Sequence, residues 1–277
     1  MIRRSSTKKT GTTNPSASAD LSRTAPGKAV TKELERIGQL FNSYANRATN
    51  MIEPEGIEAL CSDLGVDHTD VRILMLAWKM KSEKQGYFTL DEWRVGLKSL
   101  HADTIAKLKK ALAGLVNEVR KPSNFLDFYS YAFRYCLTEE KQKSIDTESI
   151  CELLDLVLGS QFSPQVSSLV EYLKCQNDYK VINMDQWMGF FRFCNEISFP
   201  DLKNYDPDLA WPLILDNFVD WMKVRKSWAS GTSFLHFIQG TVSVTTVLIQ
   251  QNLHFSYFVF DLYACSLRFL GTVFTGI

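Results

Sequence analysis

The residues best suited to chemistry gather in one acidic and aromatic stretch. The run NYDPDLAWPLILDNFVDWM (204–222) holds two tryptophans and no lysine or arginine, and its carboxylates are Asp206, Asp208, Asp216 and Asp220. Clustered carboxylates can ligate a divalent cation, work as a general acid and base, or form an anionic face for a basic partner. The elements that position these side chains must decide among the three.

Helical spacing orders this stretch into an inner and an outer face. Pro212 suits the first turn of a helix. Apolar residues then follow i, i+3, i+4 and i+7, a stripe that faces a core, at Leu215, Phe218, Val219 and Met222. The remaining face is polar and points outward, at Asp216, Asn217, Asp220 and Lys223.

Two features favour a docking face over a merely solvated one. Asp216 falls in the first turn, where the helix dipole favours a negative charge. Ala210 is small and stands between Leu209 and Trp211, so we expect a shallow notch beside that charge. A lysine or arginine of a partner would fit there. The alternative is a solvated acidic face that binds nothing.

Other catalytic or metal-binding patterns are missing from the sequence. The histidines stand in unrelated contexts, at His68, His101, His236 and His254. The six cysteines contain no C-x-x-C spacing, and there is no glycine-rich phosphate loop. The formal net charge is zero, which gives no general reason to expect nucleic acid or an acidic membrane as partner. We expect a binding protein with no catalytic residues, no metal and no cofactor.

The stretch ends a long region of helical periodicity, which predicts an all-α domain over residues 31–227. No convincing strand or hairpin pattern interrupts it. Helices are expected over 34–44, 54–64, 71–80 and from the capping box at Thr89, then from Asp103 to before Pro122, from Ser123 to Cys136, and over 147–158, 164–174, 185–197 and 212–225.

Three segments of this region resemble the loop and exiting helix of an EF-hand. They are ANRATNMIEPEG (45–56), GYFTLDEWRVGL (86–97) and KVINMDQWMGFF (180–191). A calcium loop needs hard oxygen ligands from its first position onward, but the loops begin at Ala45, Lys81 and Cys175. We therefore predict a compact helical domain built on degenerate EF-hand-like helix pairs without the ion. A calcium-responsive EF-hand adaptor is the alternative.

The two termini differ in composition from the helical region. Residues 1–30 are rich in serine, threonine and basic residues, which predicts disorder, and their basic cluster is a nuclear address or a solvating tail. Residues 228–277 form an atypical apolar tail with two charges, Asp261 and Arg268. No run reaches 18 clean apolar residues, so we expect a poorly ordered extension, with a tail anchor in a membrane as the alternative. The start lacks the apolar core of a secretion signal.

The motifs of the helical region carry a family resemblance. NYDPDLAWPLILDNFVDWMKVRK resembles the end of the potentiating-neddylation (PONY) domain of the defective-in-cullin-neddylation family. DLGVDHTDVRILMLAWKMKSEKQGYFTLDEW (63–93) and VINMDQW (181–187) resemble the same family in the same order, so the likeness spans about 32–227. The chain is most similar to the branch with a short basic N-terminus and no ubiquitin-associated domain, whose members are typically nuclear. The resemblance implies a nuclear, and also cytoplasmic, protein.

The resemblance also implies a function. The family acts as a scaffold-like co-ligase (co-E3), not as an enzyme. It holds a charged NEDD8-conjugating E2 enzyme against the C-terminal winged-helix region of a cullin and its RING partner, so that a cullin lysine is modified. By position, the family's cullin-binding trio falls on Asp185, Ala210 and Asp216.

A second implied site is an apolar pocket for the acetylated N-terminus of the conjugating enzyme. The helix at 71–80 has two apolar stripes, one of Val71, Leu74, Met75 and Trp78 and one of Ile73, Leu76, Ala77 and Met80. One stripe suffices for a core, which leaves the other for a pocket; the alternative is a helix buried all round. By resemblance the pocket would use Ile57, Ile73, Leu76, Ala77, Met80, Gln85, Phe88, Tyr135, Leu153 and Leu156.

Overall fold

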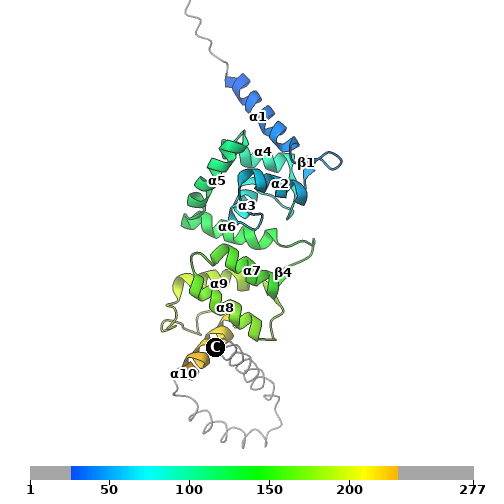
Figure 1. The fold of residues 1–277 in the computed structure, drawn as a ribbon. Helices are drawn as coiled ribbons and strands as arrows, with labels where there is room; N and C mark the ends of the chain where they lie inside the picture. The colour runs from blue at the N-terminus through cyan, green and yellow to red at the C-terminus, as the bar shows by residue number, and fades with distance from the viewer. Residues whose placement is uncertain (1–25, 230–277) are drawn as a thin grey trace, which may run out of the picture.

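The computed structural model describes residues 26–229 (Figure 1). Its helices are α1 (Pro26–Asn42), α2 (Pro54–Leu64), α3 (Val71–Met80), α4 (Leu90–Ser99), α5 (Ile105–Val119), α6 (Pro122–Tyr135), α7 (Thr147–Leu158), α8 (Ser163–Cys175), α9 (Met184–Glu196) and α10 (Leu213–Ala229). Its strands are β1 (Ala45–Asn46), β2 (Met51–Ile52), β3 (Phe88–Thr89), β4 (Ser144–Asp146) and β5 (Val181–Asn183). The prediction of an all-α domain is confirmed.

Local signals fix most helix ends. Pro54 occupies the first turn of α2, and Gly65 ends it in the left-handed conformation with φ 67°. Thr89 and Glu92 form a reciprocal capping box at the start of α4. Asn183 and Gln186 form the same box at the start of α9. Each box satisfies backbone N–H groups that the helix itself leaves unpaired.

The short strands correct the expectation that strands are absent. The loop of α1–α2 pairs with the loop of α3–α4 through β2 and β3, where Ile52 lies opposite Phe88. The strands β4 and β5 pair in the same way, with Ile145 opposite Ile182. These strands have two or three residues each, too few to produce a readable alternation of apolar and polar positions.

The second pairing reveals an EF-hand-like unit that the sequence did not predict. The helices α6 and α7, joined through β4, form a helix pair whose loop is bound to the loop of α8–α9. The described chain therefore holds four such units in two pairs. Like the α1–α2 unit, the α6–α7 unit lacks the tryptophan motif of the other two units, and it starts α7 with Asp146, whose carboxylate accepts a hydrogen bond from Ser149 N.

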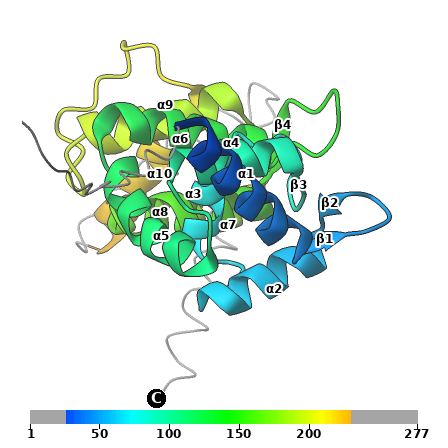
Figure 2. The same cartoon turned by 90° about the horizontal axis from the view of Figure 1, so that it is seen from above.

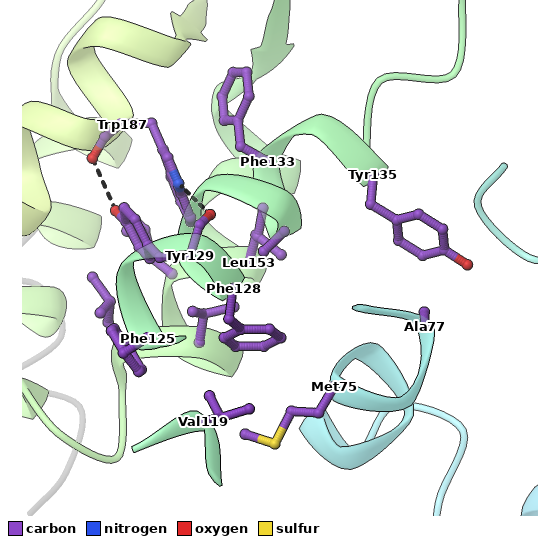
Figure 3. Close-up of a cluster of buried hydrophobic side chains, with 14 of the residues drawn as sticks. Met75, Ala77, Val119, Phe125, Phe128, Tyr129, Phe133, Tyr135, Leu153 and Trp187 are labelled. Carbon is purple, nitrogen blue, oxygen red and sulfur yellow. Dashed lines mark hydrogen bonds between the residues drawn. The ribbon is translucent and has the colours of Figure 1, made fainter. Parts of the chain in front are cut away.

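Helix α6 joins the two halves of the domain. It contacts α3 and α5 of the first half and α7 and α9 of the second, and Figure 1 shows it lying between them. Tyr129 stacks on Trp187 with ring centroids 4.3 Å apart, and each side chain donates a hydrogen bond to the backbone carbonyl of the other (Figure 3). In the first half, α1 lies over α4 (Figure 2), where Trp93 Nε1 donates to the carbonyl of Ile37.

Three predicted boundaries need correction. Helix α1 starts at Pro26, inside the segment predicted to be disordered. Helix α5 is capped by Thr104, because the neighbouring Asp103 is buried and its carboxylate pairs with Arg36. Pro212 precedes α10, and its carbonyl accepts the hydrogen bond of the first turn.

Within residues 26–229, no helix combines the length and the apolar character needed to span a membrane. The segment behind the tail-anchor alternative (233–277) and the N-terminal basic cluster (residues 3–9) lie outside the described residues.

Candidate functional site

The second turn of α9 meets the start of α10 at one edge of the domain. A Cβ on Gly189 would lie 2.6 Å from Pro212 Cγ, so only glycine lets α9 approach the start of α10 this closely. Asp185 stands four residues before Gly189, hence on the same side of α9, and is exposed in its first turn. Asp216 lies in the first turn of α10. The contact at Gly189 therefore brings the two predicted carboxylates to the same edge.

The loop between the two helices is tied down by its own polar groups. Asn204 accepts a hydrogen bond from Ser198 N at 2.7 Å and donates one to the carbonyl of Glu196 at 2.7 Å, which closes the end of α9. The carbonyl of Asp206 accepts the indole N–H of Trp211 at 3.0 Å. Ala210, the third member of the predicted trio, is exposed on a loop with a defined path.

Tyr205 fixes the position of Asp216. Its hydroxyl donates a hydrogen bond to Asp216 Oδ1 at 2.5 Å, and its ring stacks on Trp211 with centroids 5.5 Å apart. Burial, followed by the hydrogen bond to Asp216, raises the pKa of Tyr205, so the hydroxyl keeps its proton. This hydrogen bond holds the half-buried carboxylate of Asp216 in one orientation. The role of Tyr205 was not predicted from the sequence, although Tyr205 belongs to the NYD motif at 204–206.

The cations near this edge are already engaged. Arg192 lies with its guanidinium 4.1 Å from the centroid of Trp211 and bonds Glu196 at 2.9 Å. Lys223 pairs with Asp220 at 3.5 Å on the exposed surface, where such a pair is worth little. A basic partner would therefore meet Asp185 and Asp216 without displacing a strong ion pair of the domain.

The predicted pocket residues come from five elements. They lie on α2 (Ile57), α3 (Ile73, Leu76, Ala77 and Met80), the α3–α4 connection (Gln85 and Phe88), α6 (Tyr135) and α7 (Leu153 and Leu156). All are buried except Gln85, which is exposed, and Leu156, which is half-buried. Tyr135 extends from the end of α6 on the side where Ala77 lies (Figure 3), and its hydroxyl accepts a hydrogen bond from Gly86 N at 3.4 Å.

The burial of the two apolar stripes of α3 differs from the expectation that one of them is left free to form a pocket. The stripe assigned to the pocket is buried throughout, and Ala77 is 1% exposed. In the other stripe Met75 is buried in the cluster with Val119 and Phe128 (Figure 3), whereas its other members are half-buried. The helix is thus nearly buried all round, which was the alternative interpretation.

The EF-hand-like loops use their acidic side chains internally. Glu92, at the last loop position, accepts hydrogen bonds from the backbone N–H of Glu83 at 2.9 Å and of Thr89 at 2.7 Å. Gly56 takes the same position in the first loop, where a Cβ would lie 2.2 Å from the carbonyl oxygen of Tyr44. Among residues 26–229 no three histidine, cysteine or acidic side chains gather as metal ligands.

Comparison with known proteins gives the family. The family model described as cullin binding matches residues 107–221, which include α9, the following loop and most of α10. DCN1-like protein 5 of Homo sapiens is 38% identical over 187 residues, covering 68% of this chain and 77% of that protein. DCN1-like protein 4 of Homo sapiens is 40% identical over 192 residues, covering 69% and 64%. DCN1-like protein 4 of Drosophila melanogaster is 36% identical over 180 residues, covering 65% and 71%. The chain therefore belongs to the DCN1-like family of cullin-binding proteins.

Proposed function

We propose that this protein is a non-catalytic co-ligase for cullin neddylation. In this proposal Asp185, Ala210 and Asp216 bind the C-terminal winged-helix region of a cullin. The apolar set around α3 binds the acetylated N-terminus of a NEDD8-conjugating E2 enzyme. Holding both next to the cullin's RING partner brings the charged enzyme to the cullin lysine, so the rate rises through proximity alone.

One observation carries the cullin half of the proposal. The second turn of α9 packs closely against the start of α10 at Gly189, and the first turn of each helix carries a carboxylate at its positive end. Ala210 is exposed on the loop that joins these two helices, and its side chain is a single methyl group. Two anions and a small exposed side chain at one edge of the domain suit a pair of lysine or arginine side chains.

The chain contains a matched control for this site. Asp91 lies within the capping box of α4, one residue before Glu92, as Asp185 lies within the capping box of α9, one residue before Gln186. Both are exposed acids in the first turn of a helix. Asp91 also forms a surface pair with Arg94 at 3.3 Å, which is worth little. Asp185→Asn and Asp91→Asn remove the same charge from the same helix position, so their main difference is location.

The test is titration calorimetry of the full chain with a cullin C-terminal winged-helix fragment. Losing one partner of a desolvated charge pair costs roughly 2–5 kcal/mol, so Asp185→Asn and Asp216→Asn should each weaken binding about 30-fold or more. Asp91→Asn should bind like wild type. Equal, small losses for all three variants would mean that the acids act only through overall charge, and the proposed site would be abandoned.

The conjugating-enzyme site needs a variant that does not damage the core. Ala77→Arg would bury a charge, because Ala77 is 1% exposed, and unfolding would then mask any effect on binding. Leu156 is half-buried at the edge of the set, so Leu156→Lys changes the rim while the cation reaches water. Leu126→Lys on the exposed face of α6 is the control, because Leu126 lies outside the predicted set.

The corresponding assay uses a peptide from the N-terminus of the conjugating enzyme, with and without the acetyl group. Wild type and Leu126→Lys should prefer the acetylated peptide, whereas Leu156→Lys should bind it several-fold more weakly. All three proteins should retain cullin binding. An equal affinity for both peptides in the wild type would refute the pocket without affecting the cullin site.

We further propose that the protein acts in the nucleus and the cytoplasm. The basic cluster Arg3, Arg4, Lys8 and Lys9 would act as the address. Imaging of a fluorescent fusion tests this, because substitution of the cluster by alanine should deplete the nuclear signal.

A further inference from the structure

Two exposed leucines flank the proposed cullin site. Leu213 is 67% exposed at the start of α10, the highest value among the large apolar side chains of the described residues, and Leu209 is 47% exposed in the loop before it. They stand four positions apart in the chain, so their backbones lie at most about 14 Å apart. Ala210 stands between them in sequence. The two leucines therefore occupy the same edge as the acidic trio.

The fold does not need Leu213 on the surface side. The next two residues, Ile214 and Leu215, are 3% and 1% exposed and supply the apolar contacts of the first turn of α10. Scattered single leucines are common on protein surfaces and carry no information alone. Here the two lie four positions apart, Leu209 near the end of a loop whose path is fixed by Asn204 and Trp211, and Leu213 at the start of the helix that follows it. Exposed apolar side chains on a segment with a defined path are better candidates for a contact surface than those on a mobile segment.

The charges around the leucines indicate what would cover them. The same segment carries exposed acids at Asp206 and Asp208, and Asp216 lies one turn beyond Leu213. A lipid surface with anionic head groups would be repelled by these carboxylates. A protein segment in which basic side chains alternate with an aliphatic one would satisfy both the acids and the leucines.

We propose that Leu209 and Leu213 form the apolar half of the cullin-docking site and contact an aliphatic side chain next to the cullin's basic residues. This inference rests on the proposed function and deepens it, because it assigns two residues that the acidic trio does not include. The acids orient the partner, and burial of the leucines supplies affinity that charge alone does not.

Salt separates the two contributions. Charge pairs weaken as the ionic strength rises, exposed pairs more than desolvated ones, because the Debye length falls from about 10 Å at 0.1 M to about 3 Å at 1 M. Burial of apolar surface is not screened in this way. Loss of a leucine should therefore cost the same factor at low and high salt, whereas the effect of Asp216→Asn should shrink as salt is added.

The experiment compares Leu213→Ser with Val224→Ser in the full chain. Val224 is 41% exposed on the same helix, eleven residues further along, and serves as the matched control. Calorimetry with the cullin C-terminal winged-helix fragment is run at 0.1 M and 0.5 M salt. Leu213→Ser should weaken binding about tenfold, or about 1.4 kcal/mol, at both salt concentrations, and Leu209→Ser should weaken it less. Val224→Ser should bind like wild type, and thermal melting should be unchanged in all three.

The outcomes distinguish this inference from the proposal on which it rests. Wild-type affinity of Leu213→Ser together with weak binding by Asp216→Asn would overturn the apolar contact and leave the acidic site in place. Equal losses for Leu213→Ser and Val224→Ser would also overturn it, as a nonspecific effect of exposed apolar residues. Wild-type affinity of both Leu213→Ser and Asp216→Asn would overturn the proposed cullin site as well.

Discussion

Replacement of Tyr205 by phenylalanine isolates the hydrogen bond that holds Asp216. The change removes only the hydroxyl, which donates to Asp216 Oδ1 at 2.5 Å, and keeps the ring that stacks on Trp211. Hydrogen bonds to charged groups contribute roughly 1.5–3 kcal/mol, and water can replace part of this one because Asp216 is only half-buried. We therefore expect Tyr205→Phe to lower the free energy of unfolding by about 1–2 kcal/mol.

A thermal melt gives the first measurement. For a domain of this size, 1 kcal/mol corresponds to a shift of about 2–4 °C, so Tyr205→Phe should melt about 2–8 °C below wild type. Cullin affinity should also fall several-fold, because the freed carboxylate of Asp216 must be ordered again on binding. The loss should be smaller than that of Asp216→Ala, which removes the charge itself.

A double-mutant cycle tests the assigned cause. If Tyr205 acts through Asp216, then Tyr205→Phe should have no further effect on cullin binding in an Asp216→Ala background. The unfolding free energies should show a coupling of about 1–2 kcal/mol between the two positions. Strictly additive losses, in binding or in stability, would refute a positioning role for Tyr205.

Three further outcomes follow from the geometry of the domain. Gly56→Ala should destabilise the fold by roughly 1–3 kcal/mol in denaturant unfolding, because its Cβ would press on the carbonyl of Tyr44, whereas Gly114→Ala, with open space around it, should stabilise α5 by about 0.5–1 kcal/mol. Hydrogen bonds from Lys107 and Arg36 lower the pKa of Asp103 below its unfolded value. The ionised carboxylate therefore stabilises the fold above about pH 4, and this stabilisation is lost as the pH falls through the depressed pKa. Melting from pH 2 to 6 should show this acid loss in wild type and much less of it in Asp103→Asn. Millimolar calcium should leave the melting temperature of the full chain unchanged, and a rise of several degrees would contradict the ion-free interpretation of the loops.

The features that could be predicted from the sequence are those that neighbouring residues determine. The apolar stripe of α10 gave the inward positions correctly, since Leu215, Phe218 and Val219 are buried and Met222 is half-buried at the end of the stripe. The cap at Thr89 and the stop at Gly65 also formed as predicted. Each of these depends on contacts within one or two turns of a helix.

The features that depend on packing between distant segments were not predictable. The pairing of β4 with β5 joins segments 35 or more residues apart through three residues each, and no local pattern marks it. The helices α4, α5 and α6 pack against α3 and determine which of its faces is buried more deeply. The sequence of α3 contains two similar apolar stripes and could not reveal this difference. Tyr205 reaches Asp216, which stands eleven positions further along the chain in α10, and spacing alone does not specify this contact.

The family motif at 204–216 combines two kinds of residue, and the structure separates them. Asn204, Tyr205 and Trp211 build the loop through hydrogen bonds and ring stacking. Ala210 and Leu213 are exposed and contribute nothing to that framework. Variants of the first kind should lower the melting temperature and cullin affinity together, because they disturb the path of the loop. Variants of the second kind should lower affinity alone. The ratio of the two losses therefore assigns each position of the motif to building the site or to contacting the partner.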